Sequence, residues 1–428
     1  MKMLIVFSCL MIQFISNPAK AIAMASEEDF LTFNGNIETR LGARIKSGPH
    51  EDDMSIGEVR LQLESEKDFD DFTLNITTDF VADPVVDQYQ TNLNTGEGFM
   101  DLRLLNVVFS PTDNLDLKIG RQVLTWGTGD IIFINDLFAK DWKSFLIGRD
   151  EEYLKAPSDA IKASLFLDEL NVDIVYLPRF SSDRFIDGKR ASYYDRNTAS
   201  FAGKDSQLQV DKPDEWFEDD ELALRFYQSF GAYEGAAYFY QGFWKSPAGQ
   251  DINTGNATFP KLNVYGASLR GPMMGGISNI EMGYYKSASA AKNNPLIRND
   301  EFRFLMGFEK EVANQLTLGL QYNLERKLDY QEYKTSLPEA AIKDDENRHL
   351  FSIRLTQLLM QQDMRLSLFN FYSPSEKDGY LRMNVSYKLS DTTKIEAGAN
   401  IFYGKEQYSF YNQFQNNSNV FAAMRFEF

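Results

Sequence analysis

Cysteine and histidine are scarce in this 428-residue sequence. The single cysteine is Cys9, near the N-terminus, and the two histidines are His50 and His349. One cysteine forms no intramolecular disulfide, and no zinc-site spacing or glycine-rich phosphate loop is present. The sequence therefore predicts no cofactor and no metal. Neither histidine is paired with a nucleophile at a recognisable spacing, so we also predict that the protein is not an enzyme, with a hydrolase built on His349 as the remaining catalytic alternative.

Long apolar runs and excess positive charge are also missing. No 18-residue apolar segment follows residue 15, which excludes membrane-spanning helices in the rest of the chain. The 44 Lys and Arg residues face 62 Asp and Glu residues, for a formal charge of −18, which argues against nucleic acid as a partner.

The N-terminus has the anatomy of a secretory signal peptide. Lys2 is followed by an apolar stretch over residues 3–15 and by small residues suited to cleavage, such as Ala23 and Ala25. We expect residues 1–25 to be removed together with Cys9. The remaining residues, 26–428, show no linker or internal repeat and are expected to form one domain.

Alternation of apolar and polar side chains dominates the rest of the sequence. It is clear between residues 31 and 45, where Leu41, Ala43 and Ile45 alternate with Arg40 and Arg44. About eighteen such segments recur, and short turns alternate with long polar connections between them. Since lipid offers no hydrogen-bond partners, a closed sheet is the one non-helical way to cross it. The pattern predicts an all-β protein, a transmembrane antiparallel β-barrel of about eighteen strands with an aqueous lumen.

The C-terminal strand supports this fold. Val420, Ala422, Met424, Phe426 and Phe428 fall on one face of a strand. This ending resembles the terminal strand of Gram-negative outer-membrane β-barrels, in which a final Phe preceded by alternating apolar residues is read by the barrel-assembly machinery. The resemblance implies that Phe426 and Phe428 are an assembly signal. It also implies a location in the outer membrane, among its lipid and with acidic loops that face lipopolysaccharide.

The third long connection is unusually apolar for a solvated loop. Residues 120–127, Gly-Arg-Gln-Val-Leu-Thr-Trp-Gly, look like a strand of alginate-export-type and related bacterial porin families. In porins the third outer loop commonly folds inward and constricts the pore, so the resemblance implies this role for residues 127–157. An extracellular cap or a packing plug is the alternative. We predict that the constriction includes the following residues: Arg121, Trp126, Asp130, Asp136, Lys140, Lys143 and Arg149.

Arg121 requires a local irregularity to take part. Continued alternation would place it on the lipid face, where a charge costs about 2–4 kcal/mol at mid-bilayer. Gly120 offers a position for a β-bulge that would turn Arg121 inward.

Basic residues recur on the polar strand faces and suggest a ladder for anionic solutes: Arg40, Arg44, Arg60, Lys162, Arg225, Arg303, Arg354 and Arg382. Ion pairing with neighbouring carboxylates is the alternative role for these side chains. The leading functional prediction is a porin for passive diffusion of small hydrophilic solutes. The alternatives are an export conduit for an acidic polymer and a sealed barrel that acts as a receptor or adhesin, which the long connection over residues 181–220 favours. The sequence does not distinguish a monomer from a trimer.

Overall fold

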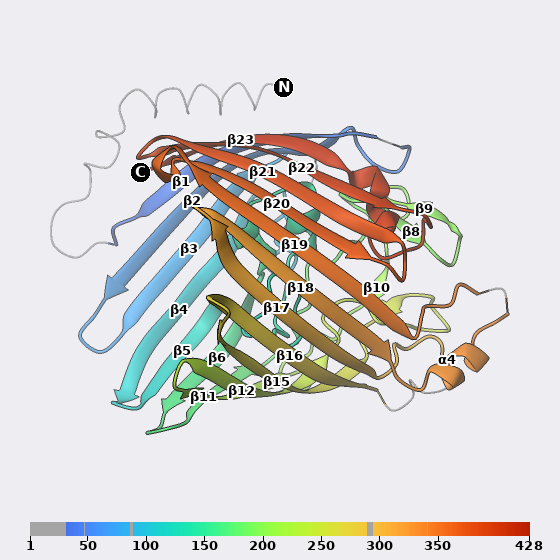
Figure 1. Ribbon diagram of the computed structural model, residues 1–428, viewed down its shortest axis with the longest axis horizontal. Coiled ribbons are helices and arrows are strands. Elements are labelled where there is room, and N and C mark those ends of the chain that lie inside the picture. The colour runs from blue at the N-terminus through green and yellow to red at the C-terminus, as the bar shows by residue number, and fades with distance from the viewer. Residues whose placement is uncertain (1–30, 47, 86–88, 289–293, 340) are drawn as a thin grey trace.

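The computed structural model describes residues 31–46, 48–85, 89–288, 294–339 and 341–428. Eighteen strands pair antiparallel with their neighbours in chain order, and β23 hydrogen-bonds back to β1, which closes the sheet into a barrel (Figure 1). The predicted eighteen-stranded antiparallel barrel is therefore confirmed. The expected signal peptide and Cys9 lie outside the described residues.

The barrel strands have the following bounds: β1 (Asn34–Arg44), β2 (Met54–Asp68), β3 (Thr73–Ala82), β4 (Met100–Thr112), β5 (Leu115–Val123), β6 (Pro157–Phe166), β7 (Asn171–Leu177), β11 (Glu221–Phe230), β12 (Tyr233–Phe243), β15 (Lys261–Met273), β16 (Gly276–Ser287), β17 (Glu301–Ala313), β18 (Leu316–Lys327), β19 (Asn347–Leu359), β20 (Met364–Ser373), β21 (Asp378–Ser390), β22 (Thr393–Gly404) and β23 (Asn419–Glu427).

Side-chain alternation sorts these strands into an apolar outer face and a charged lumen. On β1, Glu38 and Arg40 are buried inside the barrel, whereas Leu41 on the opposite face is 56% exposed. On β23, Met424 and Phe426 are exposed on the outer face, and Arg425 between them binds Glu38 across the lumen side of the β1–β23 pair. This outer face suits lipid, which solvates apolar side chains.

Connections differ strongly between the two ends of the barrel. At one end the strands are joined by tight turns, several with residues in the left-handed region, such as Met274 (φ 50°) and Gln315 (φ 56°). At the other end lie nine connections, which we number as loops: loop 1 (45–53), loop 2 (83–99), loop 3 (124–156), loop 4 (178–220), loop 5 (244–260), loop 6 (288–300), loop 7 (328–346), loop 8 (374–377) and loop 9 (405–418). Loop 8, with four residues, is a short connection in a series that the sequence predicts to be mostly long.

Loop 4 contacts several other loops and covers part of the loop end. Its short strand β10 (Val210–Asp211) pairs with β14 (Ala257–Thr258) of loop 5, which pairs with β13 (Gly249–Gln250). A second small sheet within loop 4 joins β8 (Tyr193–Asp195) and β9 (Ser200–Ala202). Polar contacts link loop 4 to loops 1, 7 and 9 through these residue pairs: His50–Asp205, Arg196–Asp344 and Ser192–Asn417. The remaining short helices are α4 (Tyr330–Ser336), η3 (Met360–Gln362) and η4 (Asn412–Asn417).

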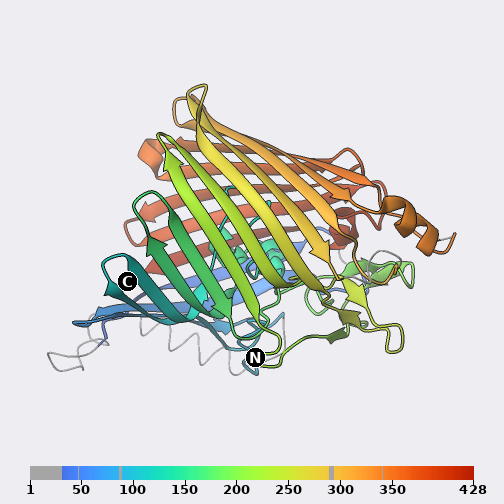
Figure 2. The same ribbon diagram turned by 90° about the horizontal axis from the view of Figure 1, so that it is seen from below.

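Loop 3 contains the short helices α3 (Trp142–Ile147) and η1 (Glu151–Leu154). Figure 2 shows this segment between the near and far walls of the barrel, and Figure 1 places it within the same outline. In the part of the chain that the structure describes, no helix is long and apolar enough to cross a membrane.

Candidate functional site: loop 3 and the lumen wall

Capping residues define the helix of loop 3 and its place against the wall. The Asp141 carboxylate accepts a hydrogen bond from the Ser144 backbone N–H at 2.7 Å, which caps the start of α3. Gly148 ends the helix with φ 85°, a conformation that favours glycine, and its N–H returns to the Ser144 carbonyl. A side chain at position 148 would collide with the Phe421 ring, because a Cβ there would lie 2.6 Å from it. The Gly148 carbonyl instead accepts a hydrogen bond from Arg40 Nη1 at 2.7 Å.

Two apolar clusters hold loop 3 against different parts of the wall. In the first, Ile134 and Phe138 pack with Tyr285 on β16 and Leu305 on β17, with Trp126 beside them. In the second, Phe145 and Leu146 pack with side chains from the far side of the barrel: Leu350, Phe369, Phe371, Tyr380 and Phe402. Burial of this apolar surface stabilises the loop in one position.

Ion pairs surround the same segment. Arg354 on β19 binds Asp130 and reaches Glu151, and Arg425 on β23 binds Glu152 at 2.8 Å. Arg149 binds Glu58 on β2, with its Nε 3.0 Å from the carboxylate. Loop 3 is thus tied to the wall by charges on both of its sides. Its role as a pore constriction is a functional claim and stays a prediction.

Glu281 on β16 is the contact that the sequence analysis missed. Its carboxylate accepts hydrogen bonds from the backbone N–H groups of Thr128 and Gly129 (2.7 Å for Gly129) and from Asn135 Nδ2 at 3.1 Å. A buried carboxylate with this many donors fixes the first turn of loop 3. The available signal was its position in the lumen phase of β16, two residues after Asn279, which donates to the Thr128 carbonyl at 2.9 Å.

The predicted constriction residues separate into three environments. Asp136 and Lys140 form a buried ion pair of 2.9 Å within loop 3, and Trp126 packs edge-on against Phe138. These contacts lie within loop 3 and stabilise its conformation. Asp130 faces the wall through Arg354. Lys143 and Arg149 line a crevice at the loop end of the barrel, which also includes residues of loops 2 and 4: Asp83, Glu97, Lys189 and Arg190.

Arg121 does not join the others, and the prediction that it points into the lumen is wrong. Register runs without a shift through Gly120, and it pairs Arg121 with Leu105 and Asp159, in phase with the exposed Ile119. No bulge therefore turns the side chain inward. Its charge is instead satisfied on the outer side of the wall by Asp159 at 3.2 Å and by the carbonyls of Leu93 and Leu102.

Members of the proposed basic ladder lie in the lumen phase, and most are neutralised there. Arg40 binds Glu38 and Glu396, and Arg60 binds Glu58 and Asp79. Four further pairs are Lys162–Asp173, Arg225–Glu234, Arg303–Glu301 and Arg354–Asp130. Arg44 and Arg382 bind backbone carbonyls, of Met54 at 2.6 Å and Arg149 at 2.9 Å. Ion pairing with carboxylates accounts for six of the eight, but only part of it is the cross-strand pairing that was the alternative: Glu38, Glu58 and Glu301 lie on the same strand as their arginines, and Asp130 lies in loop 3.

Charged side chains of loops 2, 3 and 4 are also paired with charges of opposite sign. Burial alone would raise the pKa of the Glu97 carboxyl, but the charge of Lys143 and hydrogen bonds from Lys143 and Lys189 outweigh it, so this pKa lies below its ordinary value. Lys143 lies 2.7 Å from both Glu97 and Asp187 and thereby joins loops 2, 3 and 4. Within the described residues, no three His, Cys, Asp or Glu side chains gather as a metal-binding group.

Comparison with known proteins relates this architecture to solved barrels. No protein-family model and no curated protein sequence matches the chain. OccD3 (OpdP) of Pseudomonas aeruginosa aligns with a TM-score of 0.51 at 10% identity, over 92% of this chain and 91% of that one. The likeness shows the fold. A loop-deleted OmpT of Vibrio cholerae (TM-score 0.42, 13% identity, 93% and 99% of the two chains) and Salmonella typhi OmpF in complex with daunomycin (0.44, 7%, 93% and 97%) align more loosely. The chain therefore has the β-barrel fold of outer-membrane porins, and the comparisons do not show the alginate-export-type resemblance.

Proposed function

We propose that the protein is a non-enzymatic channel of the Gram-negative outer membrane, through which small hydrophilic solutes diffuse passively. The observation that carries the proposal is the charged, water-exposed face of loop 3 inside the barrel. The side chains of Asp130 and Glu151 are 33% and 39% exposed although they bind Arg354 in the lumen. A plug that only sealed the barrel would bury these carboxylates or replace them, because buried charge is costly. Hydrated charge in the lumen supports a water-filled path beside loop 3.

Charge preference in this channel is weak. Six of the eight ladder cations are held by carboxylates, so the wall presents dipoles rather than a row of free positive charges. An acidic polymer would find no continuous basic track here and would have to displace loop 3, which argues against the export conduit. The anionic preference is thus the less supported form of the proposal.

Single-channel recording tests it directly. We expect the purified, refolded protein to give stable current steps in a planar bilayer and a reversal potential close to zero in a salt gradient. A strongly anion-selective current would contradict the weak preference but keep the channel. Complete silence, which persists when residues 131–143 are deleted from a protein that still folds, would overturn the channel.

A sealed barrel that acts as a receptor or adhesin is the second candidate. Its support is loop 4, which contacts loop 1 through His50–Asp205, loop 7 through Arg196–Asp344 and loop 9 through Ser192–Asn417. If loop 4 closes the barrel, its deletion is expected to create conductance where the intact protein has none. If the intact protein already conducts, loop 4 is a rim and this candidate fails.

A further inference from the structure

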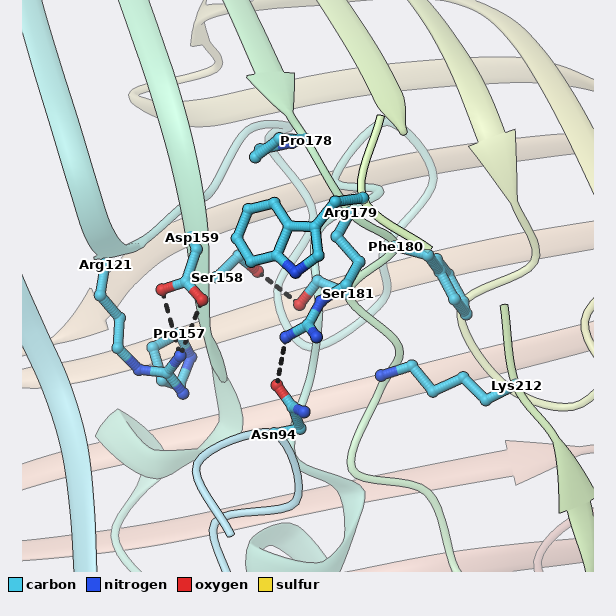
Figure 3. A pocket seen from close by; sticks show the side chains of 11 residues that line it. Asn94, Arg121, Pro157, Ser158, Asp159, Pro178, Arg179, Phe180, Ser181 and Lys212 are labelled. Atoms are coloured by element: carbon cyan, nitrogen blue, oxygen red, sulfur yellow. Dashed lines mark hydrogen bonds and ion pairs between the residues drawn. The ribbon is translucent and has the colours of Figure 1, made fainter. Parts of the chain in front are cut away.

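A small pocket lies where β5 and β6 meet loops 2 and 4 (Figure 3). Its lining includes three cations, Arg121, Arg179 and Lys212, and one carboxylate, Asp159. The lining itself has two more positive than negative groups, although the segment around Trp216 also carries Asp214, Glu215 and Glu218. Such a pocket attracts anions.

Two of these cations lack the carboxylate partners that most cations of this barrel have. Arg121 is satisfied by Asp159, whereas Arg179 makes one long hydrogen bond of 3.5 Å to Asn94 Oδ1 and lies over the Trp216 ring at 4.9 Å. The Lys212 ammonium lies 5.5 Å from the Phe180 ring. Among the described residues, no carboxylate lies within ion-pair distance of either Arg179 or Lys212. Figure 3 shows both side chains directed toward the same opening.

The protonation of Lys212 agrees with this unpaired state. Burial, followed by the nearby charges of Arg179 and Lys245, lowers the pKa of Lys212 to about 8, and Glu221 and Asp214 only partly oppose this. Glu221 is already bound by Lys245 at 2.6 Å. A bound anion would stabilise the protonated ammonium and raise this pKa.

Two strand residues of the pocket lie in the outer phase of the wall, whereas the buried Ser158 lies in the lumen phase. Asp159 is in phase with the exposed Ile161, two residues along β6, and Arg121 is in phase with the exposed Ile119 on β5. Trp216, which lines the pocket, is 51% exposed, and the neighbouring Phe217 is 69% exposed. Exposed aromatic side chains at the edge of an apolar belt are typical of the interface between lipid and water.

We propose that Arg179 and Lys212 bind the phosphate of a phosphorylated lipid of the surrounding membrane, with Trp216 and Phe217 against its apolar part. A guanidinium offers two parallel donors to phosphate oxygens, and an ammonium adds a point charge beside them. Apolar contact at the same site distinguishes a lipid from free phosphate. This site rests on the proposed membrane location but not on conduction, so its failure and the failure of the channel are separate results.

Lipid retention in native mass spectrometry provides the test. The folded protein in dodecyl maltoside is titrated with dimyristoyl phosphatidic acid, with dimyristoyl phosphatidylcholine and with inorganic phosphate. We expect the phosphatidic acid to be retained, and the double variant R179Q/K212Q to weaken its binding roughly tenfold or more, as loss of two charge-assisted contacts predicts. Lys405→Gln, which removes an exposed cation in loop 9, is the matched control and leaves binding unchanged.

Three further readouts decide the assignment. Trp216→Ala is expected to weaken the lipid but not inorganic phosphate, and lipid binding should fall as the pH rises above about 8 in the native protein but not in K212Q. Equal binding of both lipids overturns recognition of an anionic phosphate by Arg179 and Lys212, and binding of inorganic phosphate with no gain from acyl chains overturns the lipid assignment. Retained heat-modifiable migration in gels shows that each variant is folded, so unchanged phosphatidic acid binding by a folded R179Q/K212Q protein overturns the site.

Discussion

Arg354 on β19 and Asp130 in loop 3 are joined by two short contacts, with Arg354 Nη1 2.8 Å from Oδ1 and 2.7 Å from Oδ2 of Asp130. The other terminal nitrogen of the same guanidinium lies 3.4 Å from Glu151 Oε2. Asp130 precedes α3 and Glu151 follows it at the start of η1, so one wall residue contacts loop 3 on both sides of α3 in the chain. This arrangement makes the position of the loop sensitive to a single side chain.

Replacing Arg354 with Gln is expected to loosen loop 3 without unfolding the barrel. The pair is partly solvated, so its loss costs about 1 kcal/mol and shifts the population of loop positions roughly fivefold. Single-channel recordings should show more open-channel noise and additional current levels. Arg326→Gln breaks an exposed pair with Glu346 away from loop 3 and serves as the control. Identical, quiet traces from both variants would contradict the anchoring role.

Arg149→Met is expected to destabilise the folded protein far more. Glu58 is buried and shares its carboxylate between Arg149 and Arg60, so removal of Arg149 leaves a partly uncompensated buried charge. Breaking a buried pair in this way costs about 3–5 kcal/mol. The temperature at which the protein loses its fast gel migration should fall. The double variant R149M/E58Q should recover part of that loss, because Arg60 keeps Asp79. A double variant less stable than R149M would count against the explanation.

The number of strands, and the face of the sheet to which each side chain points, could be predicted from the sequence because both depend on a two-residue alternation of apolar and polar side chains. Met424 and Arg425 take opposite faces of β23 as their alternation requires, and neighbouring strands repeat the rule. At Arg121 the prediction departed from strict alternation, and it was wrong. A bulge was predicted to keep its charge out of lipid, whereas the barrel keeps the register, pairs Arg121 with Asp159 and satisfies it with the carbonyls of Leu93 and Leu102. The partner came from β6 and loop 2, which local pattern does not reveal.

Contacts of the loops depend on pairings between residues far apart in the chain. Glu281 and the Thr128–Gly129 backbone are separated by about 150 residues, and the Ser192–Asn417 bond spans 225. Neither contact produces a repeating pattern in the nearby sequence from which it could be predicted. Ion pairing on the lumen wall was easier to anticipate because cross-strand neighbours follow from register, as in Glu38 and Arg425.

Neutralising two carboxylates of η1 in loop 3 is expected to shift ion selectivity toward anions. Glu151 and Glu152 are more exposed than the arginines that bind them, Arg354 and Arg425. In water a unit charge about 10 Å from a permeating ion contributes about 0.4 kcal/mol, which is roughly a twofold change in relative permeability per charge. Reversal potentials of E151Q/E152Q in a salt gradient measure this change. Glu332→Gln in α4 alters the net charge away from the lumen and should leave the potential where it was. An unchanged reversal potential would show that these side chains do not face the ion path.

The junction of loops 2, 3 and 4 is expected to resist mild acid and to open only in strong acid. Glu97 binds Lys143 at 2.7 Å and Lys189 at 2.9 Å, and Asp187 shares Lys143. Because its folded-state pKa is depressed below the ordinary 4.5, the stabilisation from Glu97 is complete above that value and is lost as the pH falls through the depressed value. The pKa of Lys143 is raised by Asp187 and Glu97 against the effect of burial, so its contribution persists throughout neutral pH.

Current noise at several pH values measures the state of this junction. Traces of the native protein should be the same at about pH 7 and about pH 5 and should become noisier only well below pH 4.5, where Glu97 takes up a proton. Lys143→Gln should be noisy already at neutral pH, since Glu97 then keeps only Lys189 and Asp187 loses its partner in loop 3. Lys405→Gln, a loop 9 variant of equal charge change, should behave as the native protein does. A transition in the native protein between about pH 7 and pH 5 would instead place the sensitive group outside this junction.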